Sequence, residues 1–415
     1  MDNIYEKLYK YVEPFEAVST LIEGFKRKTI RLRPEKSIGY ILAEPVYAEI
    51  DRPYANLSHV DGWAVRSIDT LSASSESPVK LRVRDNVDSR RADQVELRPG
   101  ETVLVETGFP IPVIADAVIP VESARKIGNN VYIYAPVARG YNVFPRSSDF
   151  RKGEKLLDRG TRITYYAVKL LMDAGVWRIK VYDKPKIAVY STGVELKEEP
   201  AMSGQSYIPD SSRLFINHVI EELGGKIIDT ANIPDSHESI AEVVEGIMDD
   251  ADLVVTIGGV SMGPRDMTWT GIKKRIRYSR VFRGVKMHPG RSTSGFKTNT
   301  ASILNLPGLP QSTIAATILV LAPVIRYMSG AEPIIDKPKL YAKLAEDYRS
   351  DKYLGFYRMR YVEIINGEAV IWEDNPSYNV FTPLKSSGIT IIPPGKKPLK
   401  GESIPIYRPS SIYPE

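Results

Sequence analysis

The 415-residue sequence contains no cysteine and only four histidines. The absence of cysteine excludes disulfide bonds and thiolate metal sites, and it suits a reducing compartment such as the cytoplasm. With so few histidines, a histidine-rich zinc centre is not expected. A metal site in this chain would therefore be built from oxygen ligands, for which Mg²⁺ is the default ion.

Long apolar runs and a strong charge imbalance are also missing. The longest apolar segment, Ile314 to Ile325, is too short to span a bilayer and contains Thr317 and Pro323. The first residues are charged and lack the apolar core of a signal peptide. The formal net charge is only +5, without the basic stripes of nucleic-acid-binding proteins. We expect a cytoplasmic protein that binds neither nucleic acid nor membrane.

Strand and helix patterns alternate between residues 183 and 330. A chain of this length has room for about two to four domains. Apolar runs predict strands, and amphipathic spacing closed by glycines or caps predicts helices. The expected strands are 186–190, 227–233, 253–257 and 302–306, and the expected helices are 211–223, 236–248 and 311–328. This alternation predicts a doubly wound α/β domain.

The regions on either side of residues 183–330 show different secondary-structure patterns. Helical spacing appears at residues 14–28 and 165–175, and residues 79–137 read as a β module. Residues 338–410 alternate again, with an Asn366-Gly367 hairpin turn. The predicted fold class is therefore a multidomain α/β protein, with a central doubly wound α/β domain, a β-rich arm, a helical region and a C-terminal β domain.

The most informative stretch is Leu253 to Asp266, LVVTIGGVSMGPRD. A predicted strand ends in Gly258 and Gly259, and a loop with Ser261 and Gly263 leads to Asp266. Paired glycines let the backbone turn sharply and approach a ligand, and loop N–H groups can bind an oxyanion. A carboxylate beyond the loop can hold a hard cation against that anion. The stretch predicts a site for a phosphate-bearing ligand with a metal ion.

Three other predicted strands also end in suggestive loops. Glu195 follows the first strand, Asp235 the second, and Pro307-Gly308 the fourth, where a helix begins. Ligands bind beyond the carboxyl ends of the strands in an open α/β sheet. If the strands are parallel, Glu195, Asp235 and Asp266 share one edge with two glycine-rich turns. We therefore expect these three acids to bind Mg²⁺.

Each of these residues also has a purely structural interpretation. Asp235 could cap the helix that begins at Ser236, Glu195 could be a solvated loop acid, and Asp266 could be an exposed turn residue. None of the loops is a Walker A motif or a GxGxxG fingerprint. The recurrence of such loops at successive strand ends favours the functional interpretation.

Two further groups stand outside this pattern. The segment KMHPGRST carries His288 and Arg291, which either hold an oxyanion or form an ordinary charged turn. Upstream, Asp61, Thr107-Gly108 and Asp149 lie in the segments HVDGWA, ETGFPIP and RSSDF. Turn chemistry alone would explain these segments. Composition does not connect them to the α/β domain.

Taken together, the motifs resemble the molybdopterin molybdotransferase family, the group of MoeA and the gephyrin E-domain. The DG-aromatic-A element is matched by Asp61-Gly62-Trp63-Ala64, and TGAPxPxGADAVV is matched loosely by residues 107–119. A loop near Asp149, the turn STGVEL, the turn Asp210-Ser211-Ser212 and the loop 258–266 follow in order. The order and spacing agree over nearly the whole chain.

The resemblance implies four domains. These are a discontinuous helical domain (1–45 and 140–182), a β-rich arm (46–139), the α/β domain (183–330) and a C-terminal β barrel (331–415). It also implies a homodimer in which the arm of one copy completes the active cleft of the other. The enzyme that makes the substrate, a molybdopterin adenylyltransferase, is a further possible partner.

The activity implied is the insertion of molybdate into adenylylated molybdopterin, with release of AMP and assistance from Mg²⁺. Carried over by motif, the catalytic residues are Asp61, Asp235 and Asp266, and the metal ligands are Glu195, Asp235 and Asp266. The implied substrate-binding residues are Thr107, Gly108, Asp149, Glu195, Gly258, Gly259, Ser261, Gly263, His288, Arg291, Pro307 and Gly308.

The sequence departs from the family pattern at several positions. His288 and Arg291 replace lysines of the family's PGKP loop, and Leu309 replaces an asparagine. Val194 replaces an acid, and Ile114 replaces a glycine. We expect His288 to be partly charged at neutral pH. The changes leave open a non-catalytic pterin-nucleotide-binding scaffold or a paralogue tuned to tungstate, and an adenylyltransferase is a third hypothesis.

Overall fold

The structure is a computed structural model that describes residues 10–85, 87–197, 208–260, 266–335, 337–373, 376–410 and 412–413. Its contacts divide the chain into two compact units. The first comprises Met1–Ile30, Gly39–Ala43 and Val181–Glu415, and the second comprises Arg31–Ile38 and Glu44–Lys180. The four-domain division and its boundaries stay a prediction.

A six-stranded sheet forms the centre of the first unit. Its strand order is β16-β13-β17-β21-β20-β18, and the first four strands are parallel. The parallel strands are β16 (Lys226–Ile233), β13 (Lys186–Thr192), β17 (Leu253–Ile257) and β21 (Ser302–Leu306). The antiparallel strands β20 (Ser294–Lys297) and β18 (Arg280–Arg283) extend it. Every residue of β17 is buried, as expected of an apolar parallel strand covered on both faces.

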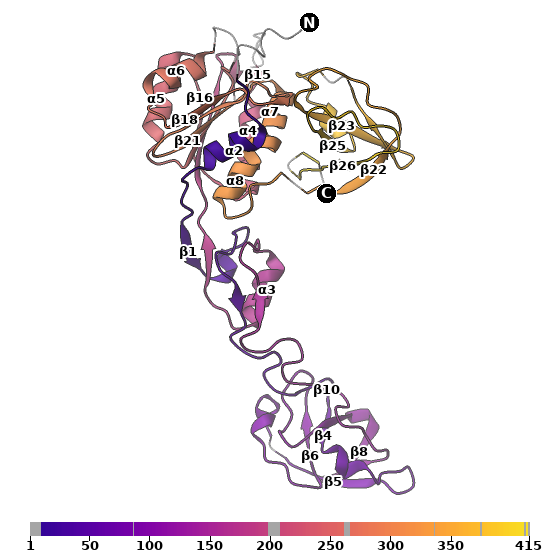
Figure 1. Cartoon of the computed structure of the whole chain (residues 1–415). Coiled ribbons are helices and arrows are strands. Elements are labelled where there is room, and N and C mark those ends of the chain that lie inside the picture. The colour runs from indigo at the N-terminus through magenta and orange to yellow at the C-terminus, as the bar shows by residue number, and fades with distance from the viewer. Residues whose placement is uncertain are drawn as a thin grey trace. The chain divides into compact units, whose positions relative to one another are not determined.

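Helices cover both faces of this sheet (Figure 1). On one face, α5 (His237–Ile247) and α6 (Met267–Arg275) pack against alternate strand residues such as Val254. On the other face, α2 (Pro14–Ile22), α4 (Ser211–Glu222) and α8 (Ala322–Met328) pack against the intervening residues, such as Val255. The prediction of a doubly wound α/β domain is therefore confirmed.

The last helical segment of this domain runs through α7 (Pro310–Ala316), a π-helical turn (Thr317–Leu321) and α8. Among the described residues, it is the one helix long and apolar enough to cross a membrane, with a mean hydropathy of 1.3. However, 83% of the apolar window is buried inside the protein, where it packs on the sheet. Its apolar character is accounted for by this core position.

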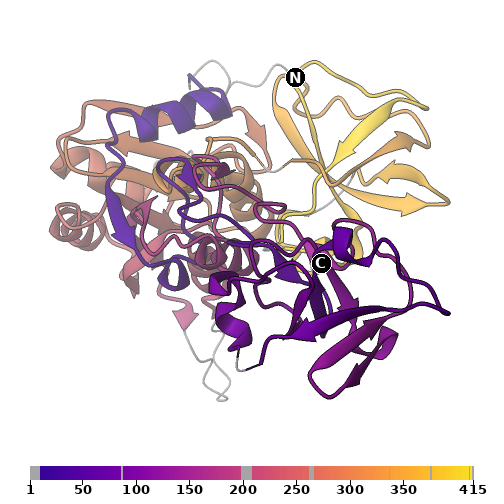
Figure 2. The same cartoon turned by 90° about the horizontal axis from the view of Figure 1, so that it is seen from below.

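Six strands form a second sheet in the first unit, and five of them come from the C-terminal region. They are β19 (Met287–His288), β22 (Leu340–Leu344), β23 (Tyr357–Ile365), β24 (Glu368–Ile371), β25 (Gly388–Ile392) and β26 (Ser403–Ile406). The order is β19-β23-β24-β22-β26, with β25 on β23. Ile389 and Tyr407 exchange two backbone hydrogen bonds of 3.0 and 2.8 Å, which join β25 to the chain after β26. The sheet thus curls into the predicted barrel (yellow in Figure 2), with the short helix α9 (Thr382–Lys385) beside it.

The predicted hairpin turn is present in this barrel. Asn366 and Gly367 have φ values of 53° and 84° between the antiparallel strands β23 and β24. Positive φ at both positions is the geometry that an Asn-Gly turn adopts between twisted strands.

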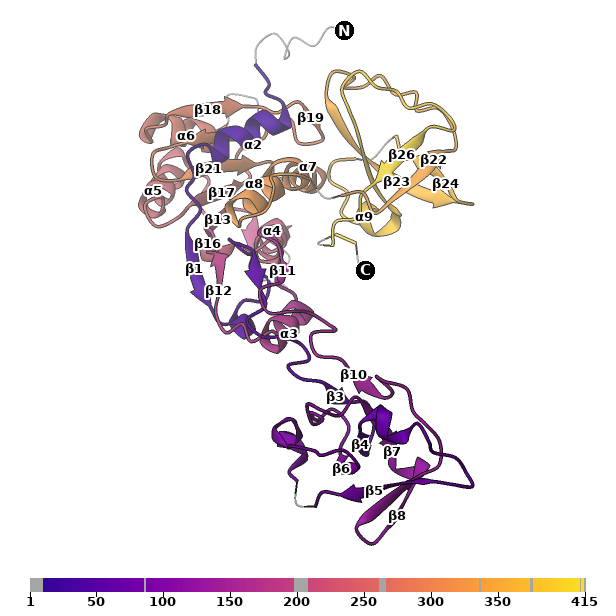
Figure 3. The same cartoon turned by 60° about the horizontal axis from the view of Figure 1, so that its bottom comes forward.

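The second unit contains the predicted β module, labelled in Figure 3. Its sheet has the order β7-β4-β6-β5-β9-β8. The strands are β4 (Gly62–Val65), β5 (Val79–Val83), β6 (Glu101–Val105), β7 (Ala117–Pro120), β8 (Ala124–Ile127) and β9 (Asn130–Ile133). Separate apolar clusters lie around Trp63 and around Ala64, because successive strand residues face opposite sides.

Short elements complete both units. The second unit has the pairs β3 (Leu57–Ser58) with β10 (Val143–Phe144) and β2 (Val46–Tyr47) with β11 (Lys155–Leu157). It also has α3 (Tyr165–Asp173) and the 3-10 turns Pro34–Lys36, Ser67–Thr70, Ser89–Gln94 and Val121–Ser123. The strand β1 (Thr29–Leu32) pairs with β12 (Ile179–Tyr182), and β14 (Leu196–Lys197) pairs with β15 (Ile208–Pro209).

Two local expectations differ from the structure. The helix predicted over 14–28 ends at Ile22, because Gly24 adopts a φ of 66°, outside the helical range. The helix α6 and the antiparallel strands β18 and β20 have no counterpart among the predicted elements. The nine residues of α6 alternate apolar, polar and glycine positions, so they carry little helical periodicity.

Candidate functional site

A cleft of about 580 Å³ lies at the carboxyl ends of the parallel strands in the first unit. The chain passes from β13 to β16 on one side of β13 and then to β17 on the other, so the strand order reverses here. Open α/β sheets bind ligands at such a reversal. The ends of β13 and β17, the start of α4 and the turn before α7 form the walls, together with Tyr378 and Val380.

Two glycine turns lie side by side in this cleft. Gly258 and Gly259 have φ values of 92° and 62°, which glycine adopts at little cost. A Cβ at Gly259 would lie 2.4 Å from Thr268 Oγ1, and a Cβ at Gly308 would lie 3.4 Å from Gly258 Cα. The predicted convergence of the two turns is therefore present. Pro307 is buried next to Gly308, and its carbonyl oxygen accepts a hydrogen bond from Thr313.

Two of the predicted acids, Glu195 and Asp235, line the same cleft. The Asp235 carboxylate lies against the glycine turn, because a Cβ at Gly259 would be 3.3 Å from Asp235 Oδ1. Helix α5 is capped by Ser236, whose hydroxyl accepts a 3.0 Å hydrogen bond from the Ser239 N–H. The interpretation of Asp235 as a helix cap is therefore wrong.

The third predicted acid, Asp266, is engaged with the protein. Its Oδ1 accepts a 2.8 Å hydrogen bond from the Trp269 N–H and caps α6, and its Oδ2 accepts from Arg283 at 3.2 Å. The residue is only 3% exposed, and burial raises the pKa of this carboxyl to about 6. Asp266 is thus not an exposed turn residue. Its role as catalytic residue and metal ligand stays a prediction, and the predicted Ser261 and Gly263 lie outside the described residues.

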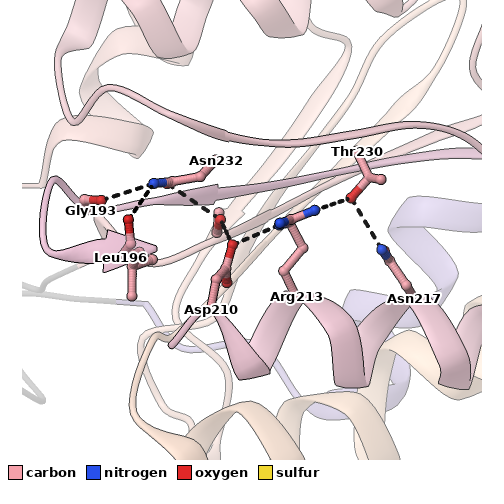
Figure 4. Close-up of polar contacts among 8 residues, drawn as sticks. Gly193, Leu196, Asp210, Arg213, Asn217, Thr230 and Asn232 are labelled. Carbon is pink, nitrogen blue, oxygen red and sulfur yellow. Dashed lines mark hydrogen bonds and ion pairs between the residues drawn. The ribbon is translucent and has the colours of Figure 1, made fainter. Parts of the chain in front are cut away.

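A buried polar network that the strand-end motifs did not predict lies at the start of α4 (Figure 4), and two of its members, Ser191 and Asp210, line the cleft. Asp210 Oδ2 accepts hydrogen bonds from Ser191 Oγ at 2.5 Å and from Arg213 Nε at 2.6 Å. The Arg213 and Asp210 side chains are 4% and 2% exposed. Arg213 also donates to Thr230 Oγ1 on β16. The network fixes the start of α4 against the sheet. In the sequence, the spacing of three residues between Asp210 and Arg213 was the pattern that could have indicated this ion pair.

The turn that carries Glu195 is held by Asn232. Its amide nitrogen donates to the carbonyl oxygens of Gly193 and Leu196, each at 3.2 Å (Figure 4). A Cβ at Gly193 would lie 2.8 Å from Glu195 Oε1, so this glycine leaves room for the carboxylate. The carboxylate is thereby presented on a turn with a defined geometry.

The basic loop lines a different cavity. His288 borders a cavity of about 160 Å³ together with Gln311 and Arg360, and its ring stacks on Tyr353 at 3.8 Å. Burial and the positive charges of Arg360, Arg291 and Lys352 lower the pKa of His288 to about 3. His288 is therefore neutral at physiological pH, and the expectation of partial charge is wrong. Arg291 donates to the Tyr353 hydroxyl at 3.5 Å.

The second unit brings two of its predicted residues together. Asp61 Oδ1 accepts hydrogen bonds from the Thr107 N–H at 2.7 Å and the Thr107 hydroxyl at 2.8 Å. These bonds lower the pKa of Asp61. The pairing of β4 with β6 places the two side by side, and Gly108 turns the chain with a φ of 81°.

Asp149, the remaining predicted residue of the second unit, lies in an exposed ion-pair cluster. Its Oδ2 lies 3.4 Å from Arg52 Nε, and Arg52 also contacts Asp173 at 3.3 Å. Arg52 therefore bridges two carboxylates and orients Asp149.

Comparison with known proteins agrees with this geometry. Residues 10–175 match the model of the MoeA N-terminal region (domain I and II), and residues 188–327 match the model of a probable molybdopterin binding domain. The chain belongs to the MoeA family. A molybdopterin molybdenumtransferase of Nostoc sp. is 29% identical over 76% of this chain and 74% of its own length. A molybdopterin molybdenumtransferase of Staphylococcus aureus strain Mu50 is 28% identical over 86% and 85%.

Solved structures of MoeA proteins share the whole fold. The molybdopterin biosynthesis moeA protein of Pyrococcus horikoshii OT3 superposes with a TM-score of 0.75 at 27% identity. That match covers 96% of this chain and 100% of the other. A second structure from the same species gives a TM-score of 0.77 at 29% identity, covering 96% and 98%.

Three departures of this MoeA-family chain from the motif pattern, at Leu309, Val194 and Ile114, lie at exposed positions, whereas His288 and Arg291 are partly buried. Leu309, in place of asparagine, lines the cleft and is 51% exposed. Val194 is 77% exposed beside Glu195, and Ile114 is 44% exposed in the second unit. Of these three, Leu309 alone lines the described part of the cleft, and the glycine turns and the cleft acids are in place.

The charge of the cleft bears on whether Mg²⁺ fits. Its described lining residues include Glu195, Asp210 and Asp235 and no lysine, arginine or histidine. Among the described residues, no group of three or more acids and histidines is arranged to hold a metal ion without help. Mg²⁺ is commonly held by one or two carboxylates together with the phosphates of its ligand. Glu195 and Asp235 fit that pattern.

Proposed function

We propose that this MoeA-family chain inserts molybdate into adenylylated molybdopterin and releases AMP, within the molybdenum cofactor biosynthesis that its family serves. The observation that carries the proposal is the shared cleft of Glu195, Asp235 and the glycine turns at Gly258 and Gly308. This arrangement suits a phosphate-bearing nucleotide that arrives with a divalent cation.

The residues of the cleft would have two roles, metal binding and phosphate binding. Glu195 and Asp235 would hold Mg²⁺, and the Gly258–Gly259 turn would receive the phosphate of the substrate at close range. Bound Mg²⁺ would neutralise charge on the phosphoanhydride and on the approaching oxyanion. The Asn232 bonds hold the Glu195 turn in position, so this carboxylate needs little reorganisation when the substrate binds.

The basic loop would serve the oxyanion through Arg291, with neutral His288 as a hydrogen-bonding neighbour. A neutral imidazole still offers one N–H donor. The loop would therefore orient the oxyanion with less charge than the two lysines of the family pattern provide. Asp266 would complete the metal and catalytic site from the start of α6.

We further propose that the chain acts as a homodimer in the cytoplasm and receives its substrate from a molybdopterin adenylyltransferase. Asp61, Thr107 and Asp149 of one copy would then complete the cleft of its partner. Mixing two inactive variants tests this arrangement. If Asp61→Ala and Asp235→Asn chains are mixed and exchange, AMP release should reappear, whereas no recovery in a mixed dimer would contradict the shared cleft.

The direct test of the activity is an AMP-release assay. Purified protein is supplied with adenylylated molybdopterin, molybdate and Mg²⁺, and a working relative such as the Staphylococcus aureus transferase is run in parallel. We expect AMP release that depends on both molybdate and Mg²⁺. Absence of AMP release while the relative works would refute the proposed function.

A further inference from the structure

A buried threonine hydroxyl in the cleft has no partner. Thr192 is the last residue of β13, lines the cleft and is 5% exposed. Its Oγ1 is buried and makes no hydrogen bond to any residue that the structure describes. Buried hydroxyls are nearly always bonded, because an unpaired one loses its hydration without compensation. The hydroxyl therefore suggests a ligand contact.

The position of the hydroxyl indicates where that ligand would lie. A Cβ atom added to Gly258 would lie 3.1 Å from Thr192 Oγ1, and a Cβ atom added to Gly259 would lie 3.0 Å from it. The added Cβ atom of Gly259 would also lie 3.3 Å from Asp235 Oδ1. The hydroxyl thus lies at the glycine turn, on the side where Asp235 lies.

Two neighbouring threonines show that the missing partner is specific to Thr192. Thr256, one strand away on β17, is fully buried and donates to Asn305 Oδ1 at 2.8 Å. Thr268, at the start of α6, donates to the Gly258 carbonyl oxygen at 3.2 Å. Both hydroxyls have structural partners, and only the hydroxyl of Thr192 among these three is left for a ligand.

We propose that Thr192 is a substrate-binding residue whose hydroxyl donates a hydrogen bond to a phosphoryl oxygen held at the Gly258–Gly259 turn. The inference rests on the proposed function, because the phosphoryl group is that of the adenylylated substrate and of the product AMP. The cleft offers no described lysine, arginine or histidine, so hydroxyls are its side-chain donors. A neutral donor can bind a phosphate oxygen without repelling the cation at Glu195 and Asp235.

The test is the isosteric change Thr192→Val, measured by calorimetry with AMP and with adenosine in the presence of Mg²⁺. AMP affinity should fall about tenfold, the usual effect of losing a hydrogen bond to a charged group. Adenosine affinity should be unchanged, because adenosine lacks the phosphate. Thr192→Ser keeps the hydroxyl and should keep the AMP affinity.

Thermal stability separates a ligand-binding role from a structural one. Removing an unpaired buried hydroxyl should leave the melting temperature of Thr192→Val at or above that of the wild type. The matched control is Thr256→Val, which removes a paired hydroxyl and leaves Asn305 Oδ1 without its hydrogen-bond donor. That variant should melt at a lower temperature and bind AMP normally.

Full AMP affinity in Thr192→Val would overturn the inference, and so would an equal loss for AMP and adenosine. If the wild type releases AMP from its substrate while Thr192→Val does so with unchanged KM, the proposed function stands and the inference alone fails. A wild type that neither binds AMP nor releases it refutes both.

Discussion

The carboxyl-end cleft and the His288 loop differ in how far along the chain the residues that determine their chemistry lie. In the cleft, Glu195 and Asp235 lie on exposed turns directly after parallel strands, so strand direction alone places them together. At the loop, burial is the main cause of the low pKa of His288, and the charges of Arg360 and Lys352, from the C-terminal barrel region, and of Arg291, on the loop itself, lower it further. The position of the two acids follows from strand direction and can be predicted from local sequence. The protonation of His288 depends on burial by distant segments and cannot be predicted in this way.

The largest effect should come from Asp235→Asn. We expect AMP release to fall by at least about a hundredfold, since the change removes a charge that would face the metal and phosphate, while the melting temperature stays close to that of the wild type. The control is Asp252→Asn, at the amino end of the same sheet, where Asp252 accepts a 2.8 Å hydrogen bond from the Lys186 N–H. Near-normal turnover in Asp235→Asn would remove this residue from the site.

The second effect concerns the buried wall of the cleft. Arg213→Ala should cost about 3–5 kcal/mol of unfolding free energy, because it leaves the Asp210 carboxylate buried without its cation. Urea denaturation measures this loss. Arg275→Ala breaks the exposed pairs with Glu242 and Glu245 and should change stability little. Similar losses for both variants would contradict the structural role of the buried pair.

The third effect tests the His288 environment by pH. The folded pKa of about 3 lies below the usual 6.5, so His288 contributes stability above pH 6.5 that is lost as the pH falls toward 3. His288→Gln should remove this acid-side loss, which amounts to at most about 5 kcal/mol between pH 6.5 and pH 3 in pH-dependent unfolding. The same change at His218, whose side chain is 80% exposed, should leave the slope as it is. An unchanged slope in His288→Gln would mean that folding does not lower the pKa of His288.

The smallest effect on stability is expected at Asp266. Its raised pKa of about 6 means that its contribution to stability is full below pH 3.8 and falls as the pH rises through 6. Asp266→Asn should remove this decline over pH 4–6, while the Arg283 pairing keeps the change modest. Unfolding curves at several pH values measure it. A wild type that gains stability relative to the variant over this range would show that the ion pair dominates burial.

The comparison also explains what the sequence could predict. Parallel strand direction and glycine turns sufficed to place Glu195, Asp235, Gly258 and Gly308 in one cleft. The neutral state of His288 and the ion pair of Asp266 with Arg283 depend on packing between separated segments, which no local pattern encodes. Thr192 was missed for the same reason, because only the surrounding residues reveal that its hydroxyl lacks a partner.

The most direct measurement is a crystal structure of the protein soaked with AMP, Mg²⁺ and molybdate. The account predicts the AMP phosphate at the Gly258–Gly259 turn, within hydrogen-bonding distance of Thr192, and Mg²⁺ between that phosphate and the carboxylates of Glu195 and Asp235. Nucleotide and metal bound elsewhere, for instance in the cavity beside His288, would contradict it.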